Sequence, residues 1–122
     1  MGRKELASVN RVLIIDQDAG SAQRLALACF DKGLAVVIVE TVCDGVRALA
    51  TTPVALIVTE LDRFRLGIAD QATLFDHVAP GVPVIVTVGR AVSLEKRAAL
   101  ELTGFRVMPS PLEADDLLKA LA

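Results

Sequence analysis

Four long apolar runs divide this chain, and they constrain its fold more than any other feature of the sequence. The runs lie within "RVLIID", "LAVVIVE", "VALIVT" and "VPVIVTV". They do not alternate between apolar and polar residues, as strands with one solvent-facing side do. Continuous apolar strands are buried on both faces, which is typical of a parallel sheet covered by helices on each side. We therefore expect all four runs to be buried strands.

Segments with helical spacing connect these runs. The first, from Ala22 to Phe30, repeats its apolar residues at helical intervals, and Gly33 follows where such a helix would end. Ser93 is placed to cap a later helix that runs to about Leu102, with Gly104 after it. A loop to about Ile68 follows the third run, and a helix that carries Leu74, Phe75 and Val78 comes after it.

The pattern as a whole predicts an α/β fold in which five strands alternate with five helices. "FRVM" supplies a weak fifth strand, and a helix with acidic residues in its first turn closes the chain. Right-handed crossovers then give a doubly wound, parallel (βα)5 sheet with the flavodoxin-like strand order 2-1-3-4-5. The functional site of such a sheet lies at the carboxyl ends of its strands. Residues 1–10 are polar and aperiodic, and we expect them to form a flexible leader.

Composition excludes several classes of function. A chain of 122 residues, of which 53% are apolar, is one folded domain rather than a disordered segment. The net charge is −2, the basic residues are scattered, and the few aromatic residues are all Phe, so we expect no nucleic-acid binding. No apolar run approaches the roughly 20 residues of a membrane helix. Two cysteines make neither a disulfide framework nor a metal site. We expect a cytoplasmic protein.

Four stretches together resemble one known family. They are "RVLIIDQDAGSAQR", "PVALIVTEL", "VPVIVTVG" and "GFRVMPSPLEADDLLKAL", in this order from about Arg11 to Ala122. The resemblance is to the receiver domains of response regulators in two-component signalling. It implies a receiver-like domain over residues 11–122 with a role in signal transduction.

The resemblance assigns a role to the ends of the first and third strands. In this family an acidic pair after the first strand holds Mg²⁺, and an Asp at the end of the third strand is phosphorylated. Asp16 matches the first acid of the pair, but Gln17 falls where the second is expected. Glu60 falls on the phosphoacceptor position, because the family commonly has Ser or Thr before the Asp, as Thr59 is here.

The switch positions of the family differ as well. A Ser or Thr ending the fourth strand and an aromatic residue in the fifth form the switch, and a Lys before a cis-proline contacts the phosphoryl group. Val88 occupies the hydroxyl position, Val107 the aromatic position and Ser110 the lysine position. Pro111 keeps the proline, so we expect a cis Ser110–Pro111 bond.

These replacements remove most of the phosphorylation chemistry. Phosphoryl transfer to a carboxylate needs a divalent ion and a fixed cation to stabilise the negative oxygens. Gln17 weakens the ion site, Ser110 removes the cation, and Glu60 is one methylene longer than Asp. A misplacement of about 1 Å can cost on the order of a hundredfold in rate. We therefore expect a pseudo-receiver, not an enzyme and without catalytic residues, that binds at most a weak Mg²⁺ through Asp16 and Glu60.

Several alternatives remain open at this stage. Counting from Pro53 places the acceptor position at Thr59 instead of Glu60. The chain could also be a working receiver that accepts phosphate on Asp62 or through an unusual Mg²⁺ geometry. Asp18, the third member of the acidic pocket with Asp16 and Gln17, is expected to cap the first helix rather than bind metal. A flavodoxin-like binder of small ligands is a further alternative, but the carboxylates of "DQDAG" would repel a flavin phosphate.

Three side chains have simpler interpretations. Glu60 is expected to be a relic of the acceptor or a salt-bridge partner of an arginine in a neighbouring loop. The candidate arginines are Arg63, Arg65 and Arg90. His77 is expected to be a surface or packing residue, and Cys29 a buried core residue.

The expected partner is a protein or a second copy of the chain. Receiver domains commonly pair through the fourth helix, fifth strand and fifth helix, so this face is the candidate contact surface. Its expected members are Ala98, Leu102, Arg106, Asp115 and Lys119.

Overall fold

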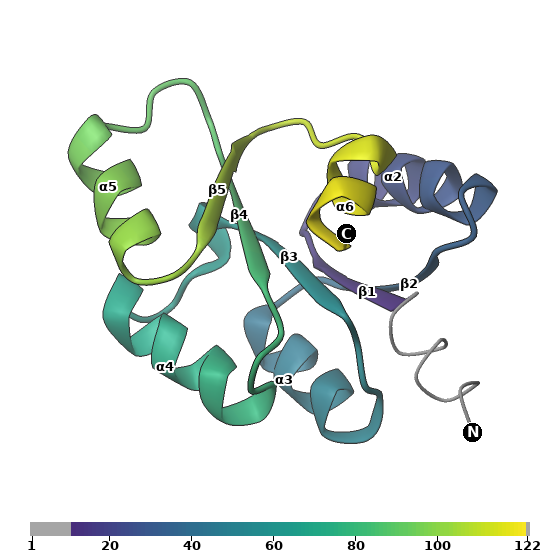
Figure 1. Cartoon of the computed structure of the whole chain (residues 1–122), viewed down its shortest axis with the longest axis horizontal. Helices are drawn as coiled ribbons and strands as arrows, with labels where there is room; N and C mark the ends of the chain where they lie inside the picture. Colours follow the sequence, from purple (N-terminus) through teal and green to yellow (C-terminus); the bar gives the residue numbers. More distant parts are fainter. Residues whose placement is uncertain (1–10, 122) are drawn as a thin grey trace.

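Five parallel strands form the centre of the computed structural model, which describes residues 11–121 (Figure 1). The expected leader, residues 1–10, lies outside the described residues, as does Ala122. The order of the strands across the sheet is β2-β1-β3-β4-β5, which confirms the predicted topology. The strands are β1 (Arg11–Ile15), β2 (Ala35–Val39), β3 (Leu56–Glu60), β4 (Val84–Val88) and β5 (Arg106–Pro109).

Helices cover both faces of this sheet. One face carries the first and last described helices, and the other carries the three helices between them (Figure 1). A short 3₁₀ turn, η1 (Leu61–Arg63), follows β3 directly. The helices are α2 (Ala19–Asp31), α3 (Val42–Thr51), α4 (Ile68–Val78), α5 (Leu94–Leu102) and α6 (Ala114–Leu121). No helix within residues 11–121 is both long and apolar enough to cross a bilayer.

Two apolar clusters, one on each side of the sheet, make up the core. Alternate residues of a strand point to opposite faces. In β1, Val12 and Ile14 therefore pack beneath α2 and α6, whereas Leu13 and Ile15 pack beneath α3, α4 and α5. All four side chains are buried, which explains why the run is continuously apolar.

The prediction that "LAVVIVE" forms a buried strand is wrong for β2. This strand lies at the edge of the sheet and pairs only with β1. Its five residues are half-buried or exposed, and Ile38 keeps 37% of its surface. An apolar run does not reveal whether its strand is central or at an edge, because both retain residues with high β propensity.

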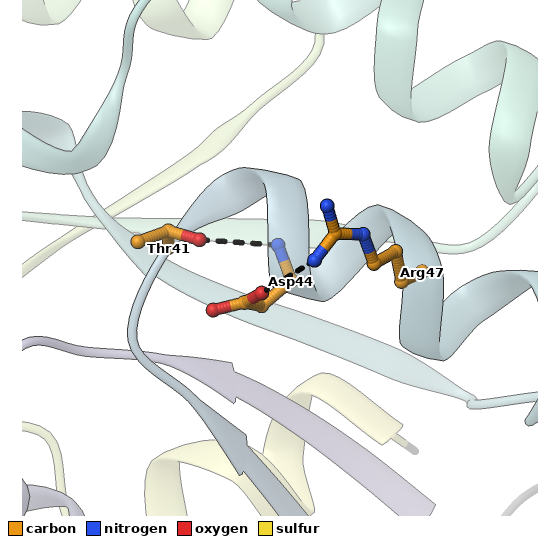
Figure 2. A network of polar contacts seen from close by, with 3 residues as sticks. All are labelled: Thr41, Asp44 and Arg47. Atoms are coloured by element: carbon orange, nitrogen blue, oxygen red, sulfur yellow. Dashed lines mark hydrogen bonds and ion pairs between the residues drawn. The ribbon is translucent and has the colours of Figure 1, made fainter.

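Side-chain caps set the start of the helices, as the sequence predicted for Asp18 and Ser93. The Asp18 carboxylate accepts a hydrogen bond from the Ser21 amide, and the Ser93 hydroxyl accepts one from the Lys96 amide. Thr41 does the same for α3: its hydroxyl accepts from the Asp44 amide at 3.1 Å (Figure 2).

Two glycines end helices, also as predicted. Gly33 and Gly104 have φ values of 81° and 105°. Only glycine adopts such angles without steric cost, so the chain can turn back toward the sheet after α2 and α5.

Candidate functional site

A cavity of about 610 Å³ opens at the carboxyl edge of the sheet, between α2 and α6. The ends of four strands contribute polar side chains to its wall. These residues are Asp16 after β1, Glu60 in β3, Thr87 in β4 and Ser110 after β5. The predicted location of the site, at the carboxyl ends of the strands, agrees with this cavity.

Asp16 and Asp18 both accept hydrogen bonds from the backbone of the turn after β1. The Asp16 Oδ1 atom accepts from the Asp18 amide at 2.9 Å. The Asp18 Oδ1 atom accepts from the Ser21 amide at 3.2 Å and caps α2. The prediction that Asp18 caps the first helix is confirmed, and Gln17 between them is exposed.

The carboxyl group of Glu60 faces that of Asp16. Burial raises the pKa of Glu60, and the hydrogen bond and negative charge of Asp16 raise it further. The charge of Asp62 acts in the same direction, while that of Arg63 lowers the pKa. The site therefore places two acidic groups against each other, an arrangement that favours one shared proton or a bound cation.

The ion pairs of residues 11–121 do not include Glu60. They join Lys32 to Asp115, Asp44 to Arg47, and Arg97 to Glu101. The expected salt bridge from Glu60 to Arg63, Arg65 or Arg90 is therefore not formed.

The hydroxyl group that β4 brings to this cavity belongs to Thr87. Thr87 lies opposite Glu60 in the β3–β4 register and is 7% exposed. Val88, which the sequence placed at the hydroxyl position, is buried in the core cluster beneath α3, α4 and α5. Strand alternation could have revealed this, because Thr87 shares its face with Ile85 and not with Val88.

The end of β5 has the expected backbone geometry. The Ser110–Pro111 bond is cis, as predicted. Ser110 is exposed at the cavity, and its amide donates to the Val88 carbonyl at 3.1 Å. Val107 is buried in the cluster beneath α5.

A second cavity of about 530 Å³ adjoins the first and shares Glu60, Thr87 and Ser110 with it. It is bordered by Asp62 from η1 and by Ser93 and Lys96 at the start of α5. Asp62 is exposed here and is not part of the first cavity's wall. Thr59 is fully buried, and its hydroxyl donates to the Glu60 carbonyl at 3.3 Å.

The remaining candidates lie away from both cavities. His77 is exposed near the end of α4. Cys29 is fully buried in α2, as expected, and burial raises the pKa of its thiol.

Comparison with known proteins finds similar regulatory proteins and similar receiver-domain structures. No family model matches the chain. Over 113 residues the chain is 29% identical to the transcriptional regulatory protein GlrR of Escherichia coli K12. The aligned region covers 90% of this chain and 25% of GlrR. The chain thus spans about a quarter of the length of this curated relative.

Solved structures share the arrangement of strands and helices. A CheY-like response regulator receiver domain from Methanospirillum hungatei superposes with a TM-score of 0.76 at 20% identity, covering 92% of this chain and 90% of that one. The fold is that of a response-regulator receiver domain. The beryllofluoride-activated NtrC4 receiver domain, solved as a dimer, gives a TM-score of 0.77 at 15% identity, covering 92% and 93% of the two chains.

The receiver fold implies a magnesium site beside the acceptor, and Asp16 and Glu60 are the two carboxyl groups that meet there and would hold such an ion. Magnesium requires oxygen ligands in a near-octahedral arrangement. Within residues 11–121 no three His, Cys, Asp or Glu side chains are grouped to hold a metal ion. Asp16 already accepts a backbone hydrogen bond, and Gln17 brings no charge.

Proposed function

We propose that this receiver domain is not phosphorylated and acts as a protein–protein interaction module in two-component-type signalling. The observation that supports this most strongly is the environment of Glu60. Its carboxyl group, at the end of β3, meets Asp16 and forms no ion pair within the described residues. An acyl phosphate formed there would bring further negative charge into an acidic site.

Phosphoryl transfer would need cations that this site does not position. The reaction depends on a metal ion and a fixed positive group to neutralise the transferred oxygens. Ser110 precedes the cis-proline, and it supplies a hydroxyl instead of a charge. Thr87 supplies a hydroxyl group at the cavity. The site therefore lacks the positive charge and not the hydroxyl.

Incubation with acetyl phosphate and Mg²⁺, followed by intact-mass spectrometry, tests this proposal. We expect no gain of a phosphate on the full chain. A CheY-type receiver treated in parallel serves as the positive control. An adduct that forms only with Mg²⁺ would contradict the proposal.

The same experiment distinguishes the second candidate function, a working receiver with Asp62 as the acceptor. Asp62 is exposed and borders the cavity that also contains Glu60 and Lys96, so a donor could reach it. An adduct that is absent in Asp62→Ala but present in Glu60→Gln would establish this alternative.

The proposed contact surface is the face formed by α5, β5 and α6. Leu94, Ala98 and Leu102 are spaced by four residues on α5 and form one exposed side of it. Leu94 and Leu102 keep 85% and 89% of their surface. Arg106 and Lys119 are exposed on the adjoining elements. The expected member Asp115 pairs instead with Lys32 of α2 and borders the cavity between α2 and α6, so it is not part of this surface. The NtrC4 receiver dimer shows that a domain of this fold can pair with a second copy.

Sedimentation velocity over a range of concentrations tests pairing through this face. We expect Leu102→Glu to weaken the self-association of the chain without unfolding the domain. Leu27→Glu is the matched control, because Leu27 is similarly exposed on α2. Equal effects of the two substitutions would argue against this face.

The remaining expectations belong to the same proposal. We place the domain in the cytoplasm, without enzymatic activity and without contacts to nucleic acid or membrane. A flavodoxin-like function is not favoured, because carboxylates rather than phosphate-binding groups line the turn after β1.

A further inference from the structure

We propose that the outer edge of β2 pairs with the same edge of a second copy of the chain. The two strands would run antiparallel, with Val37 of each copy on the two-fold axis. β2 and β5 lie at opposite edges of the sheet, so this surface is separate from the face formed by α5, β5 and α6 (Figure 1). The inference does not depend on that face or on whether the domain is phosphorylated.

The first observation is that the β2 edge lacks the features that keep edge strands from pairing. Natural proteins place charged residues, proline or a bulge at such edges. At the other edge of the sheet, β5 has an exposed Arg106 and ends in Pro109. All five residues of β2 (Ala35–Val39) are apolar, and their register with β1 is continuous. Within residues 11–121, β2 pairs only with β1.

The second observation concerns the backbone of β2. The Asp16 amide donates to the Val39 carbonyl at 2.9 Å, so the backbone groups of Val39 face β1. Along a strand, the N–H and C=O groups of successive residues point to alternate sides. Those of Val37 therefore also face β1, whereas those of Val36 and Ile38 point away from the sheet. Each of these two residues offers one N–H donor and one C=O acceptor at the outer edge.

These outward groups match those of a second copy when the two-fold axis passes through Val37. In an antiparallel pair, two residues at a hydrogen-bonded position exchange both of their bonds. An axis at Val37 places Val36 opposite Ile38 of the second copy, and Ile38 opposite Val36. An axis at Val36 or Ile38 would instead pair one of them with residue 34 or 40, which lies outside the strand. The axis at Val37 therefore satisfies all outward groups with strand residues alone.

Exposed apolar side chains at this edge would be shielded from water by the pairing. Val36 and Ile38 point to the side of the sheet that α2 covers, and Ile38 keeps 37% of its surface. Phe30, in the last turn of α2, keeps 77%. Phe30 lies about half a turn around α2 from Ala28, which borders the cavity shared with α6. It is therefore on the side of α2 nearer the β2 edge.

Charge also favours a second copy as the occupant. No residue of Ala35–Val39 is charged, so symmetric pairing opposes no like charges along the two strands. The nearest charged residues in the sequence are Asp31 and Lys32 before the strand and Glu40 after it. Antiparallel pairing brings Glu40 of each copy toward this mixed pair and not toward the other Glu40. A partner strand that carried charges of its own would find no counter-charge along this edge.

Disulfide trapping in the full chain tests the pairing and its register. Cys43→Ser removes the exposed native thiol, and Val37→Cys in that background places two new thiols opposite each other on the axis. Facing residues at such a position lie about 4.5 Å apart at Cα, within the range of a disulfide. We expect mild oxidation to link the Val37→Cys protein into a dimer.

Ala35→Cys in the same background is the matched control. Ala35 is exposed and lies on the same face of the sheet as Val37. An axis at Val37 places it opposite Val39 of the second copy, so two thiols at position 35 do not meet. Dimer formation by Val37→Cys that does not exceed that of Ala35→Cys would overturn the proposal.

Amide hydrogen exchange distinguishes a second copy from other occupants of the edge. In the unmodified chain, the Val36 and Ile38 amides should exchange several-fold more slowly as the protein concentration rises to about 1 mM. The Val37 amide faces β1 and should be protected throughout. Protection of Val36 and Ile38 that is independent of concentration would assign the edge to residues 1–10 or another part of the same chain, and would overturn the proposal. Fast exchange at every concentration would overturn it as well.

Two substitutions separate this surface from the face formed by α5, β5 and α6. Ile38→Lys places a charge at the β2 edge and should lower the yield of the Val37→Cys dimer by about tenfold, because each dimer loses two cross-strand pairs. Leu102→Glu should leave that yield unchanged. The dispersion of the NMR spectrum shows whether each variant is folded. An undiminished yield in folded Ile38→Lys, or a loss caused by Leu102→Glu alone, would overturn the proposal.

Discussion

Glu60 and Asp16 bring two carboxyl groups together at the ends of β3 and β1. Burial, the hydrogen bond with Asp16 and the charges of Asp16 and Asp62 raise the pKa of Glu60 against the opposing charge of Arg63. The folded protein therefore holds a proton on Glu60 more strongly than the unfolded chain does. The contribution of Glu60 to the stability of the fold therefore decreases as the pH rises through its raised pKa. The contribution is recovered when the pH falls toward the ordinary pKa of Glu, about 4.3.

Glu60→Gln is expected to increase the free energy of unfolding at pH 8, because it removes a carboxylate that the fold disfavours. The gain should stay below about 1 kcal/mol, since water screens a group that is only partly buried. Urea denaturation at pH 8 and at pH 5 measures it, and the gain should be smaller at pH 5. Glu40→Gln, at an exposed position after β2, is the control and should show neither effect. A loss of stability in Glu60→Gln at pH 8 would contradict this account.

Leu100 and Leu102 lie two residues apart on α5 but face opposite surroundings. Leu100 is fully buried in the core cluster, whereas Leu102 is almost fully exposed. We expect Leu100→Ala to cost about 2 to 5 kcal/mol through lost burial and the cavity it leaves. Leu102→Ala should change stability by no more than about 0.5 kcal/mol. Chemical denaturation of both variants measures the difference, and similar values would show that α5 is rotated from the orientation described.

The start of α3 separates the effect of a cap from that of a surface ion pair (Figure 2). Thr41→Ala removes the acceptor for the Asp44 amide and should cost about 1 kcal/mol. Arg47→Ala removes an exposed ion pair with Asp44 at 3.4 Å and should cost less than about 0.5 kcal/mol. Thr41→Ser keeps the acceptor and is the matched control. Thermal denaturation compares the three, and a larger loss in Arg47→Ala than in Thr41→Ala would be inconsistent with this ranking.

The sequence was most informative where one physical cause acts alone. Central strands must be apolar on both faces, so β1, β3 and β4 were recognisable from their composition. Helix ends at Gly33 and Gly104 were recognisable because a positive φ angle requires glycine. The exposure of β2 was not, because its place at the edge depends on which strands pair, and that is a property of the whole sheet.

The site was less predictable, because it depends on register and on pairs of side chains. Counting along β4 selected Val88, whereas the pairing of β3 with β4 brings Thr87 opposite Glu60. A shift of one residue moves a side chain to the other face of a sheet. The partner of Glu60 was also missed: the charges of nearby arginines suggested a salt bridge, but the side chain faces Asp16. Which of two neighbours a carboxyl group faces is decided by tertiary packing.

Restoring the replaced groups tests whether they are what prevents phosphorylation. The triple variant Gln17→Asp, Glu60→Asp and Ser110→Lys supplies the second metal carboxylate, the shorter acceptor and the fixed cation. No change at Val88 is included, because Thr87 already provides a hydroxyl beside the acceptor position. We expect the triple variant to gain one phosphate from acetyl phosphate in the presence of Mg²⁺, as read by intact mass, while Glu60→Asp alone gains little. Addition of Asp16→Asn to the triple variant should abolish the gain, since a metal ligand is lost. If the triple variant folds and still gains no phosphate, the barrier lies in the placement of the backbone and not in these three side chains.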